Sequence, residues 1–176
     1  LVKRDLPFRM NAEGLASAIH KNFIVLSEKK GAKIEYDMEY KELPPDIKAS
    51  NVAAAARIPV VLSLVGLRVR PATSVPVKSD PKIQKTIEDN IELLAEAEHN
   101  GWMEEKLKNG WNYGPARNND LKLHPAMIPY GNLKEEDKGK DRDSVRKYPR
   151  VVADAGYEVV KAMSEPVDVK KKRKGN

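Results

Sequence analysis

The chain contains an internal repeat, which constrains its fold strongly because both copies should adopt the same local structure. The segment LASAIHKNF at 15–23 recurs as LAEAEHNGW at 94–102, with the leucine, both alanines and the histidine in register. Gly31 and Gly110 keep the same spacing of 79 residues. Each copy therefore begins with a related segment that ends at a glycine.

Later in each copy the spacing between equivalent residues grows to 90. YKELPPDIKASN at 40–51 aligns with YGNLKEEDKGKD at 130–141. The second copy is thus 11 residues longer, and the extra length falls within GWNYGPARNNDLKLHP at 110–125. Any site built from that segment should exist once.

The first copy predicts two helices and a short extended exit. We expect one helix over 15–30, ended by Gly31, because glycine readily adopts the left-handed conformation that stops a helix. A second helix is expected from Ser50 or Asn51 to Gly66, since serine and asparagine are favoured N-caps.

The second copy predicts the same order of elements. Asp80 is a good cap for a single long helix over Pro81–Asn109, with proline at its first position. Its partner helix is expected at about 140–155. Pro59 and Pro149 occupy equivalent places and predict a kink or break in the second helix of each copy.

These patterns predict a mainly α fold with short β segments, α+β in a minor part. Tandem units of helix, loop with short strands, and helix should pack about a pseudo-twofold axis, because units of this size bury too little surface to be stable alone. The predicted divisions are a first repeat at 12–70, a Pro-rich linker at 71–81, a second repeat at 82–162 and a basic disordered tail at 163–176.

The positive charge is concentrated at one end of the chain. The net charge is +6, and Lys170–Lys174 contribute five positive charges, so the rest is almost neutral. Nucleic-acid binding is therefore not expected, apart from nonspecific contact by this basic run. The chain has no cysteine, which excludes disulfides and thiolate sites. The opening LVKRDLPFRM lacks the apolar stretch of a secretory signal, and a cytoplasmic location is expected.

The second copy resembles the ryanodine-receptor-type repeat, the RyR domain, over about 90–160. The first copy, at about 12–70, resembles a degenerate relative without the Trp-Tyr-Gly-Pro-Arg and His-Pro segment. The resemblance implies a ligand-binding or interaction module, and tandem repeats of this family form compact pseudo-symmetric helical units, one of which is reported to hold an adenine nucleotide. The residues that carry it are His99, Trp102, Gly110, Trp111, Tyr113, Gly114, Pro115, Arg117, Lys122, His124, Pro125, Pro129, Tyr130, Asp141 and Arg142.

Aromatic and cationic residues of the second copy suit a nucleotide, because an aromatic ring can stack on a base and arginine can bind a phosphate through paired hydrogen bonds. We expect the pocket to lie in the second repeat and in the groove between the copies. Trp111 and Tyr113 could instead be structural residues of a short hairpin, and Arg117 is the most direct candidate for ligand contact. The candidate ligand-binding residues are Trp102, Lys106, Trp111, Tyr113, Arg117, Lys122, His124, Tyr130 and Arg142.

Four further residues are expected to support the structure or frame the pocket. His20 and His99 recur at equivalent places, which suggests a structural hydrogen bond in both copies, to the helix starts expected at Asn51 and Asp141. The scattered histidines favour no metal site, and no cofactor is expected. No nucleophile elbow or phosphate loop is present, so we expect no enzyme. The alternative function is a protein-interaction scaffold or a self-associating module without a small ligand.

Overall fold

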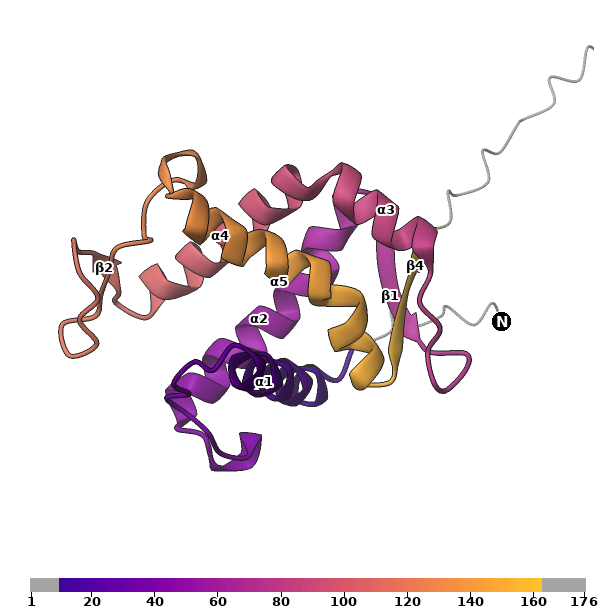
Figure 1. Ribbon diagram of the computed structural model, residues 1–176, viewed down its shortest axis with the longest axis horizontal. Coiled ribbons are helices and arrows are strands. Elements are labelled where there is room, and N and C mark those ends of the chain that lie inside the picture. The colour runs from indigo at the N-terminus through magenta and orange to yellow at the C-terminus, as the bar shows by residue number, and fades with distance from the viewer. Residues whose placement is uncertain (1–9, 163–176) are drawn as a thin grey trace, which may run out of the picture.

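The computed structural model describes residues 10–162 of the chain (Figure 1). The predicted tail, with Lys170–Lys174, lies outside the described residues. The prediction of a mainly α fold with short β segments is confirmed. The elements are α1 (Ala12–Lys29), the 3₁₀ turn η1 (Tyr40–Glu42), α2 (Pro45–Ser63), β1 (Leu67–Pro71), α3 (Pro81–Asp89), α4 (Ile91–Lys108), β2 (Asn112–Tyr113), β3 (Leu123–His124), η2 (Tyr130–Asn132), α5 (Glu135–Asp154) and β4 (Tyr157–Lys161).

The exit strands of the two copies pair with each other about a local twofold centre. β1 and β4 are antiparallel, and Val69 lies opposite Val159, its own equivalent 90 residues later. At one end of the ribbon the Ala162 N–H donates to the Gly66 carbonyl, at 2.7 Å; at the other the Ala72 N–H donates to the Gly156 carbonyl, at 3.0 Å. Each of these bonds is the repeat equivalent of the other.

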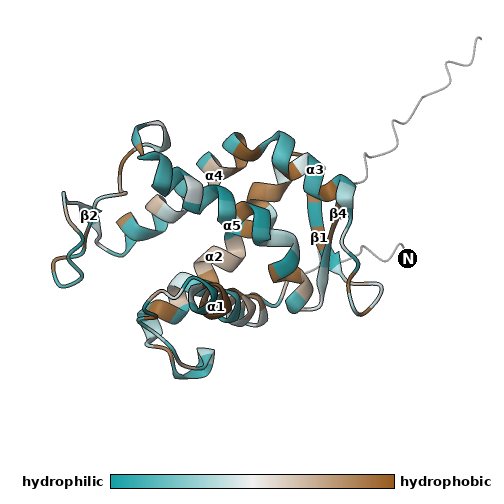
Figure 2. Cartoon of the chain, viewed as in Figure 1, coloured by the Kyte–Doolittle hydropathy of each residue, from teal (hydrophilic) through white to brown (hydrophobic). Residues whose placement is uncertain are grey.

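One hydrophobic core joins the two halves. It contains Leu15 of α1, Ile58 of α2, Leu94 of α4 and Val152 of α5, all at most 1% exposed. Hydrophilic residues predominate on the rest of α5 and around β2 (Figure 2). β2 and its loop extend from one end of the molecule, whereas β1 and β4 lie at the other (Figure 1).

The second helix of each copy begins earlier than the N-cap pattern predicts. α2 begins at Pro45 and α5 at Glu135, so Ser50, Asn51 and Asp141 lie inside helices. Proline is suited to the first turn, where its missing N–H is not needed, and acidic side chains are favourable at a helix N-terminus. These two signals determine the starts.

The predicted single helix Pro81–Asn109 is wrong, because the chain breaks at Asn90. Asn90 has φ −120° and ψ 21°, and its side chain donates to the Thr86 carbonyl at 2.8 Å. The break leaves α4 as the equivalent of α1, and α3 as an addition. α2 and α5 run through Pro59 and Pro149, so a break at these prolines is wrong, whereas a kink there stays a prediction.

A buried ion pair joins the halves beside this core. Arg57 of α2 donates to Glu98 of α4 at 3.0–3.3 Å, and the Tyr148 hydroxyl of α5 donates to the same carboxylate at 2.5 Å. Burial, followed by the charge of Glu98, raises the pKa of Tyr148 well above its ordinary value. Three helices thus share one carboxylate.

Gly101 provides the space for this arrangement. A Cβ at Gly101 would lie 2.4 Å from Cδ of Arg57. We expect Gly101→Ala to destabilise the protein by about 1–3 kcal/mol, because Arg57 must move away from Glu98. Gly139→Ala is the control: nothing lies within 4 Å of its Cβ, and it should be neutral or stabilising by about 0.5–1 kcal/mol. Urea denaturation measures both, and equal effects would contradict the packing role of Gly101.

Candidate functional site

The longer loop of the second copy folds onto the end of α4. Residues of β2 and β3 form a short parallel pairing, in which the Asn112 N–H donates to the Lys122 carbonyl at 2.9 Å. A Cβ at Gly114 would lie 2.7 Å from Cβ of Leu123, so only glycine fits there without a shift. The loop is therefore held in a defined conformation.

The loop places two of the candidate aromatic residues in a packed cluster with α4. The ring centroids of Trp102 and His124 are 5.0 Å apart and nearly perpendicular, and those of Trp111 and His124 are 6.4 Å apart. The Lys106 ammonium lies 5.2 Å from the Trp111 ring. Burial, followed by the charges of Arg117 and Lys106, lowers the pKa of His124. His124 thus contacts both tryptophan rings in edge-to-face geometry.

Tyr130 and Arg142 belong to an ion-pair network on the same half. The Tyr130 hydroxyl donates to Glu92 at 3.0 Å, and the Arg142 guanidinium binds Glu92 and Glu135. Two carboxylates already surround Arg142, which leaves little of its charge for an incoming anion.

The remaining loop candidates are exposed and do not converge. The Arg117 Nε donates to the Asn119 side chain at 3.0 Å, and the Lys122 ammonium donates to the Asn109 carbonyl at 2.9 Å. The Tyr113 side chain is exposed. None of the nine candidate ligand-binding residues lines the three cavities described below.

The two repeated histidines bridge α1 or α4 to the following loop. His20 Nε2 lies 2.7 Å from the Met38 carbonyl, and His99 Nε2 lies 2.8 Å from the equivalent Ile128 carbonyl. His99 Nδ1 also lies 3.2 Å from Asp141. Among the described residues no corresponding bond joins His20 to Asn51, which stands where the second copy has Asp141.

Both nitrogens of His99 face oxygens that only accept hydrogen bonds, an arrangement that favours the doubly protonated imidazolium. Burial by itself lowers the pKa of His99, but the hydrogen bonds to Asp141 and to the Ile128 carbonyl outweigh it. The pKa of His99 therefore stands above its ordinary value. Through these two contacts the buried His99 side chain links α4 to α5 and to the chain before η2.

A groove of about 400 Å³ lies between the two halves, where α1 and α2 face α4 and α5. Its wall is mostly apolar, and it includes Ile58, Val151 and the Phe23 ring, which is 55% exposed. Phe23 is the repeat equivalent of Trp102. The loop that covers Trp102 is missing from the first copy, so Phe23 is left open.

Cationic side chains line the same groove. Lys30, Lys140 and Lys147 all contribute, and Lys140 is paired with Asp137 at 2.8 Å. Within residues 10–162, Lys30 and Lys147 have no ion pair. Burial lowers the pKa of Lys147, and Lys30 lowers it further, although Asp143 acts in the opposite direction. Glu98 and Asp143 also line the groove, and they are paired with Arg57 and Arg146 outside it. The groove thus combines apolar contact with a net positive charge.

The sequence pattern of the second copy did not point to these residues. The repeat alignment did hold the signal for Phe23, since it paired Phe23 with Trp102 and showed the first copy without a covering loop. Lys30 and Lys147 come from helices of different halves, and no local motif links them.

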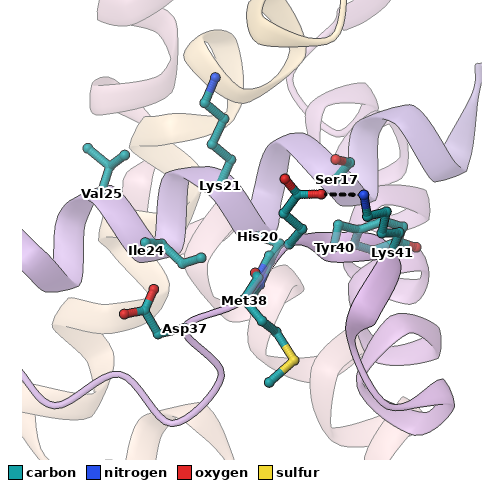
Figure 3. A pocket seen from close by; sticks show the side chains of 10 residues that line it. Ser17, His20, Lys21, Ile24, Val25, Asp37, Met38, Tyr40 and Lys41 are labelled. Atoms are coloured by element: carbon teal, nitrogen blue, oxygen red, sulfur yellow. Dashed lines mark hydrogen bonds and ion pairs between the residues drawn. The ribbon is translucent and has the colours of Figure 1, made fainter.

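Two further cavities lie outside this groove, and one of them shares Lys147 with it. One, of about 670 Å³, lies in the first half between α1 and the chain before η1, where the Lys41–Glu39 ion pair neutralises its charge locally (Figure 3). The other, of about 1000 Å³, lies beside the linker, α5 and β4.

Comparison with known protein families gives a match over the second half of the chain. Residues 76–161 match the model of the RyR domain, so the match begins before α3 and ends with β4. No helix within the described residues has a stretch long and apolar enough to cross a membrane. The match does not extend to 12–70, where a degenerate copy stays a prediction. Residues 76–161 of the chain are therefore an RyR domain.

Proposed function

We propose that the protein is a non-enzymatic ligand-binding module whose groove between α1 and α5 binds a small anionic ligand, a nucleotide or a nucleotide-derived molecule. One observation carries this proposal: half-buried Lys147 lies near Lys30, beside the exposed ring of Phe23. Neither lysine forms an ion pair within residues 10–162. Two neighbouring ammonium groups repel each other, and an anion between them removes that repulsion.

The groove also suits the apolar part of such a ligand. The Phe23 ring can stack on a base, while Ile58 and Val151 exclude water from the contact. A phosphate reaching Lys30 and Lys147 would favour the charged form of Lys147 and raise its pKa. The ligand would then touch both halves of the molecule.

A thermal-shift screen tests the proposal with adenosine and guanosine nucleotides, cyclic dinucleotides and inorganic phosphate. A ligand at about a hundred times its Kd stabilises the folded state by about 2.7 kcal/mol, which raises Tm by roughly 5–10 °C in a protein of this size. We expect such a shift with at least one nucleotide, and its loss in Lys30→Gln and Lys147→Gln.

The control for these variants is Lys29→Gln, which changes the preceding, exposed lysine of α1 that does not line the groove. It should keep the full shift. Arg117→Ala distinguishes the groove from the loop: a shift lost in Arg117→Ala and kept in both groove variants would place the ligand on the loop and overturn the proposal. No shift with any nucleotide would do the same.

A further inference from the structure

The largest of the three cavities lies along a face of α5 that neighbours the groove, and Lys147 lines both. It measures about 1000 Å³ and is bounded by residues 77–81, by α5 between Arg146 and Asp154, and by β4. Those residues of α5 span about 12 Å along the helix axis. This length equals about four residues of extended chain. We refer to this cavity as the linker cleft.

The linker cleft has an excess of positive charge that the protein does not neutralise. Arg70 is paired with Glu158, and Arg146 with Glu88. Lys78, Lys147 and Arg150 also line the cleft, and none of them has an ion pair within the part of the chain that the structure describes.

The acidic residues of the cleft are already engaged. Asp80 accepts the Lys82 N–H at the start of α3, at 2.9 Å, and Asp154 accepts a hydrogen bond from Asn22 at 2.8 Å. Glu158 binds Arg70 and the Thr73 hydroxyl. The lining nevertheless keeps a net positive charge, because five cationic side chains face the three carboxylates of Asp80, Asp154 and Glu158.

β4 contributes an unpaired backbone edge to the wall at Val159, a residue that is 8% exposed. The bonds at Gly66 and Ala162 and at Ala72 and Gly156 fix the ladder, so the N–H and C=O groups of Val159 point away from β1. They have no hydrogen-bond partner among residues 10–162. Val159 lines the cleft. An unpaired strand edge is a template for a further extended chain.

We propose that the linker cleft docks an extended acidic segment of a partner protein, which adds to the edge of β4 and places its carboxylates against Lys78, Lys147 and Arg150. The cationic side chains of the cleft and the unpaired backbone of β4 together favour this occupant. A small phosphate could meet the cations, but only a peptide also supplies N–H and C=O groups to the strand edge. This site is separate from the nucleotide groove, with Lys147 common to both walls.

Fluorescence anisotropy with a labelled eight-residue peptide of alternating valine and glutamate tests the proposal on the full chain. We expect saturable binding, with the affinity falling at least tenfold in Lys78→Gln with Arg150→Gln. Lys82→Gln, on exposed surface nearby, should keep the affinity. Lys30→Gln should keep it too, which separates this result from any failure of the groove proposal.

Two further probes distinguish strand addition from general attraction of anions. The same peptide with alternate amides N-methylated keeps its carboxylates but cannot extend the sheet, and we expect it to bind at least tenfold more weakly. Inorganic tripolyphosphate should compete poorly. Equal binding of the N-methylated peptide, or an affinity unchanged in the double variant, would overturn the proposal, the latter by placing the peptide elsewhere, such as on Lys170–Lys174. The absence of binding at millimolar peptide would overturn it as well.

Discussion

Glu98→Ala is expected to destabilise the protein by about 3–5 kcal/mol, because it leaves the Arg57 guanidinium buried without its counter-charge. The side chains of this pair are only 15% and 10% exposed, and the Tyr148 hydroxyl would lose its acceptor as well. Urea denaturation followed by circular dichroism measures the loss as a fall in the midpoint.

Glu104→Ala is the matched control for this variant. Glu104 lies on the same helix and pairs with Lys108, but both side chains are about 70% exposed. Exposed pairs of this kind contribute at most about 0.5 kcal/mol. If Glu98→Ala were no worse than Glu104→Ala, the buried pair would not be what holds α2 to α4.

Asp141→Asn is expected to cost about 1.5–3 kcal/mol below pH 6.5 and progressively less at higher pH. The variant retains an oxygen acceptor for His99 Nδ1 but removes the charge that stabilises the imidazolium. Because the pKa of His99 is raised on folding, its contribution is fully present below the unfolded pKa of about 6.5. That contribution disappears as the pH rises through the folded pKa.

Comparing the two proteins from pH 5 to pH 9 isolates this contribution. The pKa of His124 is lowered on folding, so His124 contributes stability above about pH 6.5 that is lost as the pH falls. Asp141 is not among the charges that act on His124, and the difference between the two proteins reports His99. A difference independent of pH would show that His99 is neutral. The imidazole ¹⁵N shifts of His99 give a direct second measurement.

The sequence predicted the symmetry better than the helix ends. The matching spacings placed His20 with His99 and Val69 with Val159, and both pairs have equivalent positions in the structure. The helix starts failed because polar residues such as Asn51 occur inside helices as well as at their caps, and first-turn proline or acidic residues determined the boundary.

The candidate site was only partly accessible from the sequence. The aromatic residues near Trp111 were recognisable as a unit, but the sequence does not reveal that Trp102, Trp111 and His124 pack on one another. The groove depends on Lys30 and Lys147, which lie in different halves of the molecule. Tertiary packing brings them close together, and no local sequence pattern predicts it. The sequence alignment showed that the first copy lacks the longer loop. Only the structure shows that Phe23 is exposed as a result.

The pairing of β1 with β4 also governs the order in which the molecule can be completed during synthesis. β1 and its partner are separated by about 90 residues, and β1 has no strand to pair with until β4 has been made. At translation rates of about 5–20 residues per second, that interval is roughly 5–20 s. Throughout it, the first half must remain on the ribosome with an unpaired, partly apolar strand, and the nascent chain is most exposed to aggregation or chaperone capture at that stage.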